Sequence, residues 1–161
     1  VDNDLKPTVI QCDIHGANGL AFSADRRWMY TSDTPNAVIY RTPLDEQGEP
    51  GRREVFRRFQ PGEGIPDGAA IDVEGCYWSA MFDGWRIARF SPQGEALESY
   101  PMPVRCPTMV CFGGADMKTL YITTTRENME DDELAQYPLS GAIFTLPVEV
   151  AGMKKLPFRE R

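Results

Sequence analysis

The chain has 161 residues, which fits one domain of ordinary size, and its 42% hydrophobic and 25% charged residues argue against a chain that is disordered by composition. With 24 acidic against 17 basic residues, the formal net charge of -7 argues against nucleic-acid binding, because phosphate contacts need basic surface. No apolar run approaches the roughly 18 residues of a membrane-spanning helix, so no membrane partner is expected.

The N-terminus and the cysteines bear on where the protein works. The first residues show neither an initiator Met nor a signal-peptide pattern, which suggests that the true N-terminus is missing. Cys12, Cys76, Cys106 and Cys111 form no CxxC pair, which predicts buried free thiols in a reducing compartment rather than a zinc site. A cytoplasmic location follows only as a default.

Short β-like runs follow one another along the chain, and long helical periodicity is absent. They cover 8–12, 28–31, 37–40, 53–56, 76–79, 86–90, 120–123 and 142–146. The 14 glycines and 13 prolines are scattered between these runs and predict frequent turns. Many short strands separated by turns indicate an all-β sandwich, barrel or propeller.

An internal repeat favours the propeller. Three leader residues, Asn18, Asp67 and Thr108, each precede an apolar strand, a turn rich in Asp or Gly, and an aromatic second strand. The leaders are spaced by 49 and 41 residues, and repeats of about 40–50 residues with four strands each are typical of propeller blades. The predicted blades cover approximately 14–60, 61–101 and 102–150. A β-sandwich with accidental similarity remains the alternative.

The number of blades is too small for a closed ring. Propellers close with about 4–8 blades. The chain holds three, with the run at 8–12 as a strand of a preceding blade. We therefore expect that the chain is a fragment of a longer protein, or that a second copy or another chain completes the propeller.

Two of the leader residues carry oxygen atoms that suit a metal ion. Asn18 and Asp67 precede equivalent inner strands, so both are expected at the mouth of the central channel. An amide oxygen and a carboxylate are hard ligands for Ca²⁺, Mg²⁺ or Mn²⁺. The alternative is that both are turn residues, since each is followed by glycine.

Several ordered segments resemble the senescence-marker-protein/gluconolactonase/regucalcin family. They are 18–23, 64–78, 84–94, 107–116, 119–126 and 138–144. The resemblance covers essentially the whole chain. It implies that residues 1–161 are the C-terminal part of one six-bladed propeller domain.

The resemblance also implies a site. Family members hold one divalent metal in the channel with a Glu, an Asn of an NGL segment and an Asp of a PDG segment. Asn18 and Asp67 match the last two, whereas the Glu and the family's substrate-binding Arg and Asn have no counterpart here. Ca²⁺ is the first choice of metal, with Zn²⁺, Mg²⁺ or Mn²⁺ as alternatives. Family members open sugar-acid lactones, and Asp67 matches their general base.

Three further residues are candidates for substrate contact, each with a plainer alternative. His15 lies three positions before Asn18 and is otherwise a loop histidine. Trp85 would stack on a sugar ring or pack within its blade. Arg126 would bind a substrate oxygen or pair with Glu127 or the acids at 130–133. The acidic run itself lacks the spacing of an EF-hand loop and predicts a solvated helical turn.

The leading functional hypothesis is a metal-dependent sugar lactonase. A non-catalytic calcium-binding or interaction module is the main alternative, and an enzyme acting on other lactones or phosphoesters is a third. A Ser-His-Asp hydrolase is not expected, because His15 is the single histidine.

Overall fold

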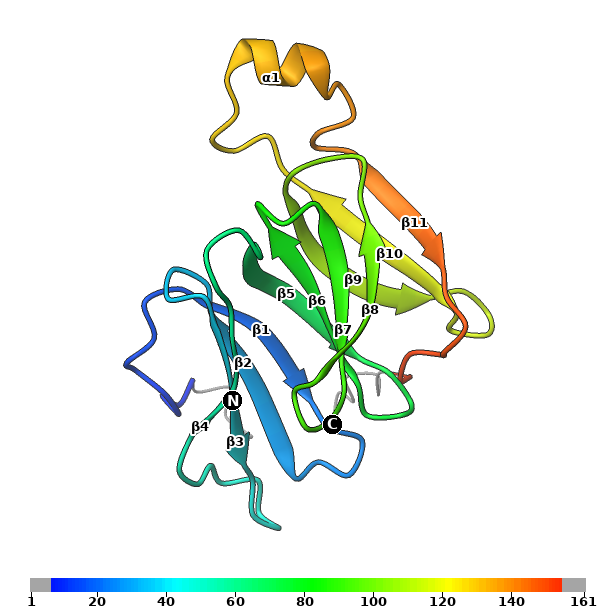
Figure 1. Ribbon diagram of the computed structural model, residues 1–161. Coiled ribbons are helices and arrows are strands. Elements are labelled where there is room, and N and C mark those ends of the chain that lie inside the picture. The colour runs from blue at the N-terminus through cyan, green and yellow to red at the C-terminus, as the bar shows by residue number, and fades with distance from the viewer. Residues whose placement is uncertain (1–6, 155–161) are drawn as a thin grey trace.

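The computed structural model describes residues 7–154, and its core is built from eleven strands in three antiparallel sheets (Figure 1). The first sheet contains β1 (Ala17–Phe22), β2 (Trp28–Asp33), β3 (Val38–Pro43) and β4 (Glu54–Arg58). The second contains β5 (Ile65–Ile71), β6 (Tyr77–Phe82), β7 (Arg86–Phe90) and β8 (Ala96–Pro101). The third contains β9 (Pro107–Gly113), β10 (Thr119–Thr124) and β11 (Ile143–Pro147), with the helix α1 (Asp131–Gln136) between β10 and β11. The predicted all-β fold is confirmed.

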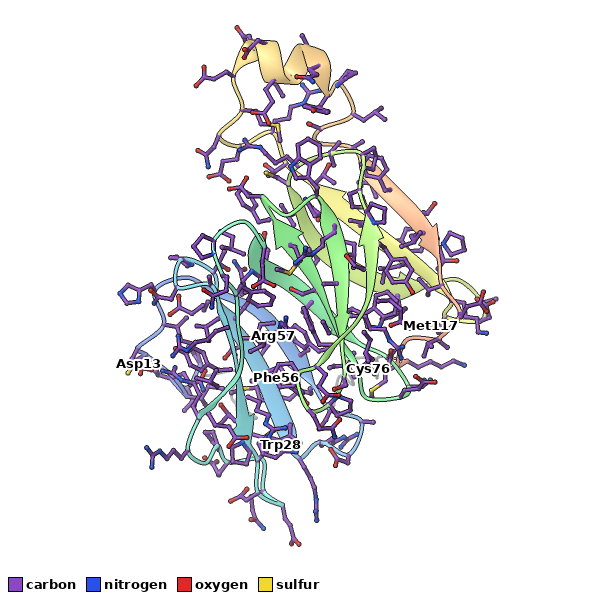
Figure 2. All side chains as sticks on the ribbon, in the orientation of Figure 1. Asp13, Trp28, Phe56, Arg57, Cys76 and Met117 are labelled. Atoms are coloured by element: carbon purple, nitrogen blue, oxygen red, sulfur yellow. The ribbon has the colours of Figure 1, made fainter. Side chains whose placement is uncertain are left out.

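The second sheet lies between the other two, and its side chains show this by alternation. Tyr77 packs with Tyr30 and Phe56 of the first sheet, and Figure 2 labels Phe56 there. The next residue, Trp78, points the other way and packs on Phe112 of the third sheet. Successive side chains of a strand face opposite sides, so a strand buried on both faces needs apolar residues at consecutive positions.

The first strands of the sheets lie next to one another. β1 contacts β5, and β5 contacts β9. A Cβ atom added to Gly68 of β5 would lie 2.6 Å from the Thr108 carbonyl oxygen of β9. Because the sheets are meanders that start on these strands, the leader residues of the repeat all lie at the beginning of an inner strand.

Two expectations about strands need correction. No strand forms at 8–12, and Val9 and Ile10 are exposed. Residues 7–154 form no other strand of a preceding blade with which this segment could pair, and the Gln11 amide instead donates to the Thr42 hydroxyl of β3 at 2.9 Å. The third sheet has three strands within the described residues, rather than four.

All four cysteines are free thiols, as expected, but they are not all buried. Cys76 and Cys106 are buried, Cys111 is half-buried, and Cys12 is exposed. Within residues 7–154, α1 is the single helix, and no helix there is long and apolar enough to cross a membrane.

Candidate functional site

The leader residues lie at irregularities of the inner strands. The register of β1 against β2 shifts between Asn18 and Ala21, and that of β5 against β6 shifts between Pro66 and Ala69. In each case the inner strand has one residue more than its partner, which is the geometry of a β-bulge. Bulges turn side chains away from the regular pleat and occur often beside active sites.

Three hydroxyl groups connect the backbones around Asn18 and Asp67. The Ser32 hydroxyl donates to the Asp67 carbonyl oxygen at 3.1 Å, and the Thr34 hydroxyl donates to the Pro66 carbonyl oxygen at 2.8 Å. The Tyr77 hydroxyl donates to the Gly19 carbonyl oxygen at 2.8 Å. These bonds join the start of β1, the end of β2 and the start of β5 across the boundary between the first two sheets.

Gly19 shows how closely these groups approach. Its φ angle is +57°, in the left-handed region that favours glycine. A Cβ atom at this position would overlap the Tyr77 hydroxyl and the Ser32 Oγ. Burial raises the pKa of Tyr77, so its hydroxyl keeps the proton that it donates. The glycine after Asn18 is therefore required by both backbone angle and space.

The Asn18 side-chain amide is hydrogen-bonded through its nitrogen but not through its oxygen among the described residues. Its Nδ2 donates to the Thr34 Oγ1 at 3.0 Å. The amide oxygen has no hydrogen-bond partner among the described residues, and Asn18 is exposed. A free amide oxygen at this place is a suitable ligand for a hard cation.

The carboxylate of Asp67 lies in an environment that disfavours its charge. Burial, with a further contribution from the negative charge of Glu127, raises the pKa of Asp67 from its ordinary 3.8 to about 6. No side chain or backbone N–H in residues 7–154 donates to this carboxylate. A half-buried carboxylate without a donor gains from either a proton or a cation.

The donor set fits a divalent cation. Asn18 and Asp67 offer two hard oxygen atoms from adjacent inner strands, and neither oxygen group is satisfied by the described protein. Ca²⁺ takes six to eight oxygen ligands, so the remaining ones must come from elsewhere. That both side chains bind one ion stays a prediction.

The third leader differs from the first two. The Thr108 hydroxyl pairs with the Thr123 hydroxyl at 2.7 Å, between β9 and β10. It has neither an amide nor a carboxylate oxygen to offer. The equivalence of the three leaders in the repeat therefore extends to position but not to chemistry.

His15 lies in a loop that is held by Asp33. The backbone N–H groups of His15 and Gly16 each donate to the Asp33 carboxylate at 3.3 Å. Burial would raise the pKa of Asp33, but hydrogen bonds from Asn36 and from these two N–H groups lower it. The His15 ring is 74% exposed and accepts a bond from the Asn36 amide at 2.9 Å. A substrate contact by His15 stays a prediction.

Trp85 lies in the turn between β6 and β7, and its ring packs edge to face on Tyr137 with the ring centroids 4.8 Å apart. Its φ angle is +56°, which a bulky residue adopts only where its surroundings enforce it. The structure thus gives Trp85 a packing partner beyond its own sheet. Sugar stacking by Trp85 stays a prediction.

Arg126 follows β10, and its Nε donates to the Ser140 carbonyl oxygen at 2.8 Å. Glu133, one of the acids expected to pair with Arg126, pairs instead with Arg105 at 2.8 Å. Arg105 also pairs with Asp83 at 3.2 Å. Arg105 therefore holds the acidic helix α1 against the turn after β6. Substrate binding by Arg126 stays a prediction.

A second acidic group, Asp72, Glu74 and Cys76, has ligand atoms within 4.8 Å of one another. Its carboxylates already have a cation. Arg89 Nη2 lies 2.8 Å from Asp72 and 2.6 Å from Glu74. Burial alone would lower the pKa of Arg89, but hydrogen bonds with these carboxylates and with Glu98 raise it. The cluster is an ion-pair network around the buried Arg89–Asp72 pair rather than a metal centre.

Reasoning from the sequence missed Ser32, Thr34, Tyr77 and Glu127. Ser32 lies near the end of β2, where the register places it directly opposite Asn18, and Thr34 follows that strand. A search for hydroxyl residues opposite the leaders could have found them. Glu127 lies in the connection between β10 and α1, and no local pattern of the sequence signals that its charge acts on Asp67.

Comparison with known proteins places these features in a family. The family described as "SMP-30/Gluconolactonase/LRE-like region" matches residues 1–126. The chain is 55% identical over 153 residues to 6-deoxy-6-sulfogluconolactonase of Pseudomonas putida, covering 94% of this chain and 53% of that protein. It is 38% identical to regucalcin of Danio rerio, covering 89% of this chain and 49% of that one.

Solved structures agree with this assignment. A calcium-binding regucalcin from Agrobacterium tumefaciens superposes with a TM-score of 0.89 at 32% identity, covering 95% of this chain and 52% of that one. A gluconolactonase from Xanthomonas campestris gives a TM-score of 0.70 at 27% identity, covering 92% of this chain and 43% of that one. The chain spans about half the length of these relatives, and its three sheets are three blades of a propeller. It belongs to the SMP-30/gluconolactonase/LRE-like family.

Proposed function

We propose that the complete protein hydrolyses the lactone of a sugar acid, with Asp67 as general base and with Asn18 and Asp67 as ligands of one divalent cation, Ca²⁺ in the first instance. The observation that carries this proposal is the half-buried Asp67 carboxylate, with its raised pKa of about 6 and no protein donor, beside the Asn18 segment. Relatives named as lactonases support the reaction class.

The chemistry requires a base at this place. Water adds to the lactone carbonyl carbon, the ring ester C–O bond breaks, and the open hydroxy acid is released. Asp67 accepts the proton that the water loses, and that proton passes to the departing ring oxygen. A divalent cation, when bound, supplies a Lewis acid that polarises the carbonyl group. General-base help of this kind contributes roughly 10²–10⁴-fold to a rate.

The substrate class is a sugar-acid lactone, and its sulfonated form is the first to examine. The relative at 55% identity is named for 6-deoxy-6-sulfogluconolactone, whose sulfonate distinguishes it from gluconolactone. Trp85, Arg126 and His15 are the residues of this chain that we propose for contacts with substrate. We expect the remaining contacts with the substrate to come from the blades outside this chain.

The functional unit that we propose is a closed six-bladed ring. Residues 1–161 form its C-terminal part, and either preceding residues or a second copy supply the remaining blades. The relatives are about twice as long as this chain, which supports the first arrangement. Four free thiols fit a reducing compartment, so we also propose a cytoplasmic location.

A lactone panel assayed with the complete protein, with and without a chelator, tests the proposal. We expect hydrolysis that stops with chelator and returns with added Ca²⁺, Zn²⁺, Mg²⁺ or Mn²⁺. Asp67→Asn should reduce the rate by about 10²–10⁴-fold, because an amide cannot accept the proton. Asp116→Asn, on the exposed turn between β9 and β10, is the matched control. Wild-type rates in Asp67→Asn would exclude Asp67 as the base.

A second candidate function is calcium binding without catalysis. Relatives named regucalcin, one of them described as a calcium-binding protein, favour it. It predicts tight Ca²⁺ binding that depends on Asn18 and Asp67, together with no hydrolysis of any lactone in the panel.

A further inference from the structure

We infer that Thr34 is a positioning residue that orients the Asn18 amide and couples it to the strand that carries Asp67. Thr34 follows β2 and touches both inner strands: its hydroxyl accepts a bond from Asn18 Nδ2 at 3.0 Å and donates to the Pro66 carbonyl oxygen at 2.8 Å. The inference rests on the proposed function, since it assigns a role at the same site.

The single proton of the hydroxyl determines how the amide is oriented. A carbonyl oxygen can only accept, so the Thr34 proton must point at Pro66. Towards Asn18 the hydroxyl then has only a lone pair, and the amide must present its N–H₂ group. The Asn18 oxygen is therefore turned away from Thr34 and left free. An unpaired amide would rotate between two orientations, of which one offers a cation nothing but N–H groups.

The backbone of Thr34 is itself fixed. Its N–H donates to the Gly16 carbonyl oxygen at 3.1 Å, and its carbonyl oxygen accepts from the Ala37 N–H at 3.0 Å. Asp33, one residue earlier, holds the neighbouring N–H groups of the same loop. A hydroxyl on such a fixed turn can define the position of a more exposed side chain.

Other groups would keep the strands together without Thr34. The Ser32 hydroxyl bonds to the Asp67 carbonyl oxygen, and the Tyr77 hydroxyl bonds to that of Gly19. Neither hydroxyl is hydrogen-bonded to the Asn18 side chain. Removal of the Thr34 hydroxyl should therefore weaken cation binding much more than it weakens the fold. Loss of a group that orients a ligand typically costs about 10- to 100-fold in metal affinity.

The test compares four variants of the complete protein. Thr34→Val and Thr34→Ala remove the hydroxyl, and Thr34→Ser keeps it. Thr42→Val is the matched control, because it removes a hydroxyl on β3 whose partner is Gln11. Ca²⁺ affinity is measured by calorimetry, and the side-chain amide signals of Asn18 are followed by nuclear magnetic resonance in metal-free protein.

We expect Thr34→Val and Thr34→Ala to bind Ca²⁺ about 10- to 100-fold more weakly and to show Asn18 amide protons that exchange faster with water. Thr34→Ser and Thr42→Val should retain both properties. Unchanged affinity and unchanged Asn18 signals in both hydroxyl-free variants would overturn the inference. If wild-type protein binds no divalent cation, the proposed function fails, and the amide signals alone decide whether Thr34 orients Asn18.

Discussion

At the scale of single residues, the candidate site contains a carboxylate that costs stability. Asp67 is half-buried, receives no hydrogen bond from the described residues and lies near the negative charge of Glu127. A residue selected for folding alone would be neutral at this position. Destabilised groups of this kind are characteristic of functional sites, where stability is traded for activity.

The pH dependence of stability follows from the raised pKa of Asp67. Because the folded state holds this proton more tightly than the unfolded state, the stabilisation is complete below about pH 4 and is lost as pH rises through about 6. The neutral amide of the Asp67→Asn variant resembles the protonated acid at every pH. We expect Asp67→Asn to stabilise metal-free protein at pH 8 by on the order of 1 kcal/mol after allowance for solvent exposure, and to have little effect at pH 4.

Urea unfolding in chelator at the two pH values measures this difference. The exposed Asp116→Asn variant should show no such gain at pH 8, since its carboxylate accepts a bond from the Lys118 N–H in a turn. A destabilised Asp67→Asn protein at pH 8 would mean that the carboxylate has a structural partner, which contradicts the account of the site.

Residues were predictable from the sequence where the repeat marks them and not where contacts cross between sheets. Asn18 and Asp67 stand at equivalent points of two repeat units, so their place at the start of inner strands could be predicted. Thr34 and Tyr77 act on a neighbouring strand or sheet through a single hydroxyl. Such a contact leaves no period in the sequence, because it depends on the register and packing of segments far apart in the chain.

At the scale of strands, too, local patterns were predictable from the sequence, whereas contacts between distant segments were not. Alternating or continuous apolar runs predicted the positions of β2, β6, β7 and β10, since the period of two follows from strand geometry. The run at 8–12 is also apolar but forms no strand, because a strand needs a neighbouring strand and residues 7–154 supply none from a preceding blade. The acidic run that forms α1 was predicted as a helical turn. The ion pair with Arg105 that holds this helix was not predicted.

The contact between β1, β2 and β6 at Gly19 gives a prediction at this scale. Gly19→Ala introduces a Cβ atom that overlaps the Tyr77 hydroxyl and the Ser32 Oγ, and it also strains a positive φ angle. Gly48→Ala is the control, because Gly48 has a φ angle of +84° but nothing within 4 Å of an added Cβ atom. Both variants carry the backbone cost of about 1 kcal/mol, and the crowded one should lose roughly 1–3 kcal/mol more.

Denaturant midpoints of the two glycine variants separate these costs. Gly19→Ala should also lose cation affinity, because its strand carries Asn18, whereas Gly48→Ala should keep it. Equal stability of the two variants would show that the start of β1 can move away from the neighbouring sheet, and that the three hydroxyl bonds do not fix the site.

At the scale of the whole molecule, three blades leave surface that a closed ring would cover. The outer face of the third sheet exposes Tyr121 and Ile143, which alternate with buried residues along β10 and with half-buried residues along β11. Apolar positions of this kind on an unpaired sheet face indicate a partner. The short helix α1 lies at one end of the sheets and leaves this face open (Figure 1).

The 161 residues are therefore not expected to behave as a stable monomer on their own. Solution size measurements on this chain should show association or loss of cooperative unfolding. Two copies could form one ring, with the third sheet of each against the first sheet of the other, and a two-fold axis along the channel would relate them. A monodisperse, cooperatively melting monomer of 18.1 kDa would refute this expectation.

The most direct test of the central claim is the position of a bound cation. Crystals of the complete protein grown with Mn²⁺, measured by anomalous diffraction, should show one ion in the channel in contact with Asn18 Oδ1 and the Asp67 carboxylate. The signal should disappear in Asp67→Ala crystals and persist in Asp116→Ala crystals. An ion at Asp72 and Glu74, or a fully occupied ion that touches neither Asn18 nor Asp67, would contradict the account.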